Sequence, residues 1–108
     1  MVYVREAHPV DGRVSSQNEA ANIAVRDPRT KEEREYVAGK ACSILKLSMP
    51  CLVDEMDDRV NRAYAAWPER LYVVDLNGNL AVAGQRGPFG FSPSLDSAES
   101  WLSRNLKP

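Results

Sequence analysis

The sequence predicts an α/β fold in which helices flank one mixed β-sheet. Short β-favouring runs alternate with segments of helical period, and this alternation is typical of parallel strands joined by helices. The last two β-favouring runs are separated only by the turn at residues 75–79, so they must pair antiparallel. A chain of 108 residues suits a single domain, here residues 1–108, with a modest core.

The hairpin within residues 67–90 is the clearest local feature of the chain. Residues 71–74 (LYVV) form the first strand, and residues 80–83 (LAVA) form the returning strand. Asn77-Gly78 is a dipeptide typical of hairpin turns, because both residues tolerate a positive φ. Pro68 precedes the first strand, where its missing N–H costs no ladder hydrogen bond.

The chain opens with a predicted strand and a long loop. Residues 2–4 (VYV) are apolar and β-favouring, and His8-Pro9 follows them. Residues 10–29 have no clear period, and the Ser- and Asn-rich stretch at 15–22 indicates a loop. A loop of this length is often functional or mobile.

A capping box predicts where the first helix begins. Thr30 can accept a hydrogen bond from the amide of Glu33, and the Glu33 side chain can reach back to Thr30. Apolar residues then recur at helical spacing, so we expect a helix from residue 31 to about residue 47, before Pro50. The expected buried face is Val37, Ala41, Ile44 and Leu45.

Residues 51–54 form a predicted strand, and two more helices follow. Asp57 or Asp58 can cap the second helix, which Pro68 ends. Ser92-Pro93 predicts the start of the last helix, with a hydroxyl at the N-cap and proline at the first helical position. The expected buried faces are Val60, Ala63, Tyr64 and Trp67 in the second helix, and Leu95, Ala98, Trp101 and Leu102 in the last.

Composition excludes several function classes. The net charge of −1 gives no broad basic surface for nucleic acid or an acidic membrane. No apolar run reaches the length of a bilayer span, and the first residues lack the pattern of a signal peptide. Cys42 and Cys51 do not have the close spacing of a zinc or redox motif, and no metal site is expected. We therefore expect two reduced cysteines in a cytoplasmic protein.

A few residues could carry chemistry. His8, the only histidine, follows the first strand, and Glu6 lies two residues earlier, so an extended strand presents both on one face. A carboxylate beside an imidazole can orient it and favour its protonated form, which suits proton transfer near neutral pH. The alternative is a surface histidine with a solvated Glu6.

Two other residues have equally open interpretations. Arg70 either pairs with Glu69 on the surface or binds an anionic ligand. Cys51 is either a small buried apolar residue or a reactive thiol, while Cys42 on the first helix is expected to pack.

Four segments together carry a family resemblance. They read VYVREAHPVDG at residues 2–12, VDEMDD at 53–58, NRAYAAWPERLYVV at 61–74 and GPFGF at 87–91. In this order and spacing they resemble the iodothyronine deiodinase family, and its bacterial deiodinase-like members in particular. The resemblance covers essentially the whole chain.

The resemblance implies a thioredoxin-like fold, in which a proline before the hairpin, often in cis, faces the redox site. Pro68 occupies that position. The implied activity is reductive deiodination of an iodinated phenol such as thyroid hormone, with a thiol reductant as cosubstrate and no bound cofactor. Glu6 and His8 would handle the proton, and Arg70 would hold the iodothyronine. A second histidine of some vertebrate members has no counterpart at residues 27–29.

In that family the nucleophile is a selenocysteine or cysteine on a βα unit that precedes the strand corresponding to residues 2–4. The resemblance therefore implies that this first βα unit is absent here, that the chain alone is inactive, and that it can form a homodimer. Cys51 could resolve an intermediate formed on that nucleophile. Two alternatives stay open: a redox-inactive thioredoxin-like binding module, and a thiol peroxidase or reductase that uses Cys51.

Overall fold

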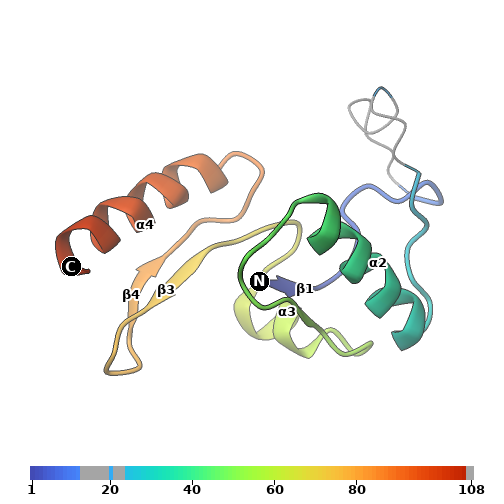
Figure 1. Cartoon of the computed structure of the whole chain (residues 1–108), viewed down its shortest axis with the longest axis horizontal. Coiled ribbons are helices and arrows are strands. Elements are labelled where there is room, and N and C mark those ends of the chain that lie inside the picture. The colour runs from blue at the N-terminus through green and yellow to red at the C-terminus, as the bar shows by residue number, and fades with distance from the viewer. Residues whose placement is uncertain (13–19, 21–23, 107–108) are drawn as a thin grey trace. The chain divides into compact units, whose positions relative to one another are not determined.

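The computed structural model describes residues 1–12, 20 and 24–106, which divide into two compact units. Unit 1 is Met1–Tyr64 and unit 2 is Ala65–Pro108. Most of the predicted loop, residues 13–19 and 21–23, lies outside the described residues. Along the chain the elements are β1 (Val2–Tyr3), α2 (Lys31–Ile44), β2 (Leu52–Val53), α3 (Arg59–Tyr64), β3 (Tyr72–Val74), β4 (Leu80–Ala83) and α4 (Phe91–Asn105) (Figure 1).

In unit 1 the two strands pair in parallel, as the alternation of strands and helices predicted. Val2 lies opposite Leu52, and Tyr3 lies opposite Val53. The Leu52 amide donates to the Met1 carbonyl oxygen at 2.8 Å, and the Asp54 amide donates to that of Tyr3 at 2.9 Å. These bonds bring the segment after β1 close to the segment after β2.

In unit 2 the predicted hairpin is confirmed. Strands β3 and β4 pair antiparallel, with an irregularity in the register between Val73 and Val74. The turn is organised by Asp75, whose Oδ1 accepts the amides of Asn77 at 2.9 Å and Asn79 at 3.0 Å. Gly78 has a φ of +84°, a conformation that glycine adopts without the steric cost of a Cβ atom.

The two pairings form separate sheets rather than one mixed sheet. The described strands make two sheets of two strands each, where the sequence predicted a single sheet. Each strand has only two to four residues, shorter than predicted for β1, β2 and β3. Because the strands are short, each pair is held by only a few ladder hydrogen bonds. The mixed α/β class is confirmed.

Helix α2 begins as predicted, but its cap differs in one contact. Thr30 Oγ1 accepts the Glu33 amide at 3.2 Å. The Glu33 carboxylate binds the amide of Arg29 at 2.8 Å, one residue before the amide expected from the capping box. The helix ends at Ile44, before the predicted residue 47, because Lys46 adopts a φ of +51° that turns the chain out of the helix.

The other two helices also differ at their ends. Helix α3 ends at Tyr64, short of Trp67, because Ala65 has a φ of +47°. Helix α4 begins at Phe91 with Gly90 as its N-cap, so the predicted start at Ser92-Pro93 is wrong. Among the described residues, no side chain caps this helix. Ser94, in its first turn, donates through Oγ to the Gly90 carbonyl at 2.6 Å and accepts the Gln85 amide at 2.8 Å.

Few large apolar side chains are buried among the described residues. The buried apolar residues are Val4, Ala38 and Ala98, and the buried polar ones are Arg34, Asp54 and Ser94. Of the faces predicted to be buried, Ala98 is confirmed, whereas Ile44, Leu45, Tyr64, Trp67, Leu95 and Leu102 are exposed. Helical spacing predicted which residues share a face, but the early helix ends and small sheets leave much of each face uncovered.

Candidate functional site

The segment after β1 carries Glu6 and His8, the predicted proton-handling pair. The chain bends there, which leaves His8 exposed and Glu6 half-buried. The Tyr3 hydroxyl donates a hydrogen bond of 2.5 Å to Glu6 Oε1. Sequence reasoning did not select Tyr3, because residues three apart on an extended strand point to opposite faces, and the bend after β1 brings them together.

The environment of Tyr3 keeps its hydroxyl protonated. Burial is the largest cause of its raised pKa, followed by the hydrogen bond to Glu6 and the charge of that carboxylate. Tyr3 is therefore a permanent donor near neutral pH, and Glu6 is its acceptor. This contact fixes one carboxylate oxygen two residues before His8.

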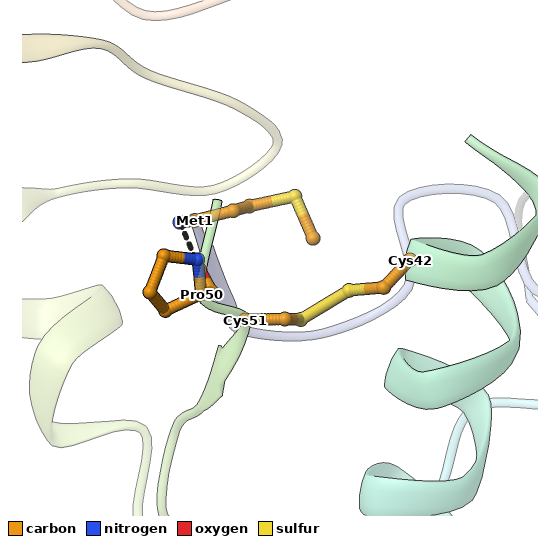
Figure 2. Close-up of a disulfide and its surroundings, with 4 residues drawn as sticks. All are labelled: Met1, Cys42, Pro50 and Cys51. Atoms are coloured by element: carbon orange, nitrogen blue, oxygen red, sulfur yellow. Dashed lines mark hydrogen bonds between the residues drawn. A yellow bond between two sulfur atoms is a disulfide. The ribbon is translucent and has the colours of Figure 1, made fainter. Parts of the chain in front are cut away.

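Cys51 lies directly before β2, and the structure joins it to Cys42 in a disulfide (Figure 2). The Cα atoms are 6.8 Å apart, and both residues are half-buried. The prediction of two reduced cysteines is wrong in this structure, because the end of α2 lies against β2 and brings together two cysteines that are nine positions apart. The cytoplasmic prediction loses its support from reduced cysteines, since disulfides are rare in that compartment.

The predicted substrate-binding residues, Pro68 and Arg70, lead into β3 in unit 2. The Trp67–Pro68 peptide bond is cis. Arg70 Nε donates to the Gly84 carbonyl at 2.8 Å. Its Nη1 donates to the Ala65 carbonyl at 3.3 Å.

The bond to Gly84 joins the segment before β3 to the residue after β4, and the bond to Ala65 lies within the segment before β3. The guanidinium carbon lies 5.4 Å from the centre of the Tyr72 ring, within the range of a cation–π contact. Two of the five N–H groups serve the backbone bonds to Gly84 and Ala65, so Arg70 is fixed in place and retains donors for an anion.

A buried carboxylate that the sequence did not reveal stands at the start of α3. Asp54 is only 2% exposed, and its side chain accepts the amides of Glu55 at 2.8 Å, Val60 at 3.0 Å and Asn61 at 2.9 Å. Asp54 therefore caps α3 through the amides of Val60 and Asn61. The predicted cap at Asp57 is also present, because Asp57 Oδ1 accepts the amide of Arg59, the first residue of α3, at 3.3 Å. Burial acts to raise its pKa, but the backbone hydrogen bonds outweigh burial, and the pKa is lowered.

Arg34 binds the same segment from α2 and is only 3% exposed. Its Nη1 donates to the Glu55 carbonyl at 2.7 Å, and its Nη2 forms an ion pair of 3.0 Å with Asp58. The sequence signal for this ion pair was a basic residue within a predicted helix, together with a cluster of carboxylates at 54–58. That signal identified neither Asp58 as the partner of Arg34 nor the burial of Arg34, since charged residues usually lie on a solvated face.

The chain is similar to known proteins over nearly its whole length. The family model described as iodothyronine deiodinase matches residues 1–106. The chain belongs to the iodothyronine deiodinase family. Tyr3, Glu6 and His8 in unit 1, and Pro68 and Arg70 in unit 2, all lie within the matched range.

Three curated relatives illustrate the extent of the match. This deiodinase-family chain is 33% identical to the type II iodothyronine deiodinase of Rattus norvegicus, over 98% of the chain and 40% of the relative. It is 31% identical to the human type II enzyme, over 98% and 38%. It is 35% identical to the thyroxine 5-deiodinase of Sparus aurata, over 96% and 36%. The chain thus spans about two fifths of the length of these relatives.

Two further findings concern the described part of this deiodinase-family chain. Within residues 1–12, 20 and 24–106, no three side chains of the metal-binding types gather closely enough to hold a metal ion. In the same residues no helix has both the length and the apolar character needed to cross a bilayer.

Proposed function

We propose that the chain is the proton-handling and substrate-binding part of a deiodinase with a thioredoxin-like fold. The observation that carries this proposal is the hydrogen bond from Tyr3 to Glu6 at the exit of the parallel β1–β2 pair, two residues before His8. It holds a carboxylate in place two residues before an imidazole, the side chain most often used in general acid–base catalysis. The family match and the names of the relatives support a substrate that is an iodinated phenol.

The proposed reaction replaces iodine on an aromatic ring by hydrogen. Two thiols, or a selenol and a thiol, supply two electrons and become a disulfide or selenenyl sulfide, while iodide leaves and the ring carbon takes up a proton. In this scheme His8 delivers the proton, and Glu6, held by Tyr3, lies two residues before the imidazole and can orient it. No bound cofactor is needed, because a thiol reductant is the cosubstrate.

Arg70 is the proposed anchor for the substrate. Its contacts with the Gly84 carbonyl and the Tyr72 ring hold the guanidinium in one orientation. The N–H groups not used in these contacts can bind a phenolate or carboxylate in a fork geometry. Pro68, two residues earlier, contributes an apolar, half-buried surface beside it.

We also propose that these 108 residues do not turn over alone. Cys42 and Cys51 are joined in the structure, so neither is present as a thiolate. The attacking selenium or sulfur must come from outside the described cysteines. The chain would then bind the substrate without releasing iodide.

The test separates binding from turnover. Thyroxine is titrated against the purified, oxidised chain by calorimetry. Iodide release is measured in parallel with dithiothreitol for the wild type and for the double variant Cys42→Ser, Cys51→Ser, in which the reductant can free no cysteine thiol of the chain. We expect saturable binding that weakens about tenfold or more in Arg70→Ala, because a charge-assisted contact is lost. Arg104→Ala, an exposed change at the end of α4, serves as the control and should bind as the wild type does.

The binding measurement and the iodide measurement each have a result that contradicts the proposal. Absence of saturable thyroxine binding would refute the binding role. Iodide release by the wild-type chain that disappears in His8→Ala would refute the proposed inactivity while supporting the role of His8.

A further inference from the structure

The first turn of α2 is bound to the end of β2 without covalent bonds. Lys31 Nζ donates to the carbonyl oxygens of Val53 at 3.2 Å and Asp54 at 3.1 Å. The buried Arg34 adds its hydrogen bond to the Glu55 carbonyl at 2.7 Å. These contacts hold the N-terminal end of the helix and do not depend on either cysteine.

The other end of α2 is held by the disulfide. Cys42 lies in the last turn of the helix, and Cys51 directly precedes β2 (Figure 2). Within the loop that they close, the Leu47 amide donates to the Cys42 carbonyl at 3.2 Å, and the Lys46 amide donates to that of Ser43 at 3.2 Å. Both of these bonds are local to the turn. The far end of the loop is held separately, because the Met1 amino group donates to the Pro50 carbonyl at 2.8 Å (Figure 2). The covalent bond joins the turn after α2 to the residue before β2.

The closed loop at residues 43–50 presents apolar side chains to solvent. Ile44 is 75% exposed, Leu45 is 62% exposed and Met49 is 54% exposed. Lys46 is its one charged side chain. The cysteines themselves are half-buried, so a thiol can approach the bond through a surface that is apolar and carries no carboxylate to repel a thiolate.

We propose that Cys42–Cys51 is a reversible dithiol–disulfide couple, and that it acts as a redox-sensitive clamp on the loop at residues 43–50. A small or protein dithiol is the reductant. The oxidised state holds the end of α2 on β2, whereas the reduced state releases the loop and leaves the Lys31 and Arg34 contacts in place. This proposal is independent of deiodination.

The disulfide is reduced by two successive thiol–disulfide exchange steps. One thiolate of the reductant attacks a sulfur of the cystine, a mixed disulfide forms, and the other cysteine leaves as a thiolate that takes up a proton. The second thiol of the reductant then attacks the mixed disulfide and releases the remaining cysteine. The protein gains two thiols, and the reductant becomes a disulfide.

Limited proteolysis of the native chain tests this clamp, because Lys46 provides a trypsin site inside the loop. The oxidised protein and the protein reduced with dithiothreitol are digested under native conditions, and cleavage after Lys46 and after Lys31 is followed by mass spectrometry. We expect reduction to speed cleavage after Lys46 about tenfold or more, since local opening exposes the loop, while cleavage after Lys31 stays unchanged. Alkylation of the reduced protein should preserve the fast rate.

The double variant Cys42→Ser, Cys51→Ser is the matched control and should show the fast cleavage with or without dithiothreitol. Three results would overturn the proposal. The first is a bond that dithiothreitol reduces only after denaturant is added, or that never forms under oxidising conditions. The second is an equal rate of cleavage after Lys46 in both states. The third is an equal rise after Lys31, which would mean that reduction unfolds the whole unit.

Discussion

At the scale of single residues, the polar contacts of unit 1 depend on a few side chains that serve more than one partner. Tyr3 pairs with β2 through its backbone and with Glu6 through its hydroxyl. Asp54 pairs with Tyr3 through its amide and caps α3 through its carboxylate. A change at either position therefore acts on the strand pair and on a neighbouring element together.

Tyr3→Phe tests the contact that orders the proposed proton pair. The substitution removes the hydroxyl that donates to Glu6 and keeps the ring. We expect a loss of about 1.5–3 kcal/mol in the free energy of unfolding, the usual range for a hydrogen bond to a charged group. Urea denaturation measures it. Tyr36→Phe is the control, because Tyr36 is 67% exposed and its ring contact with Lys40 survives the change; equal effects of the two substitutions would contradict the prediction.

Asp54→Asn tests the buried cap and has a defined pH dependence. The variant keeps an oxygen that can accept the Glu55 and Val60 amides, but it replaces the oxygen that accepts the Asn61 amide by an NH2 donor and removes the charge, which should cost about 1–3 kcal/mol at neutral pH. Because the folded-state pKa of Asp54 is below 3.8, its contribution is complete above the unfolded-state pKa and is lost as pH falls through the folded-state value.

The difference in unfolding free energy between wild type and Asp54→Asn should therefore shrink in acid. Urea denaturation of both proteins at neutral pH and at about pH 3 measures it. Asp96→Asn, an exposed change on α4, should alter stability little at either pH. A difference that grows as the pH falls would show that the sign is wrong.

At the scale of elements, the contact of the hairpin with α4 depends on the absence of a side chain at Gly84. A Cβ atom there would collide with the Leu71 carbonyl oxygen and would lie 2.9 Å from Ser94 Cβ. We expect Gly84→Ala to lower the free energy of unfolding by about 1–3 kcal/mol, because a buried backbone must shift.

Gly39→Ala is the matched control for that substitution. Gly39 lies within α2, and a Cβ atom there would meet no atom within 4 Å. Alanine should stabilise the helix by up to about 1 kcal/mol. Thermal or urea unfolding compares the two variants; a neutral Gly84→Ala would mean that β4 and α4 adjust without cost.

The ends of the helices were difficult to predict from the sequence, because they do not depend on local capping residues. The capping box located the start of α2, since its chemistry is local to residues 30–33. The ends of α2 and α3 are decided by positive φ angles at Lys46 and Ala65, residues that do not favour that conformation by themselves. Helix α4 begins after Gly90 without a side-chain cap, so no capping residue marks its start in the sequence.

At the scale of the whole molecule, apolar exposure supports a homodimer as a proposal. Leu76 is fully exposed and Phe89 is 94% exposed, and every described strand is an edge strand of a two-stranded sheet. Exposed apolar groups and open edges favour association with a second copy. We expect sedimentation velocity to show a dimer whose fraction rises with concentration. A monomer at every concentration would refute the dimer.

The sequence by itself determined the α/β class, the hairpin at Asn77-Gly78, the start of α2 and the family, because local turn and capping chemistry and the order of short segments suffice for these. It also selected Glu6, His8, Pro68 and Arg70 as site residues, whose roles stay predictions. Only the tertiary structure decided the Cys42–Cys51 disulfide, the hydrogen bond from Tyr3 to Glu6 and the burial of Arg34 and Asp54. Each of these needs either the contact of α2 with β2 or the bend after β1, and the chain path that brings such residues together has no local signal in the sequence.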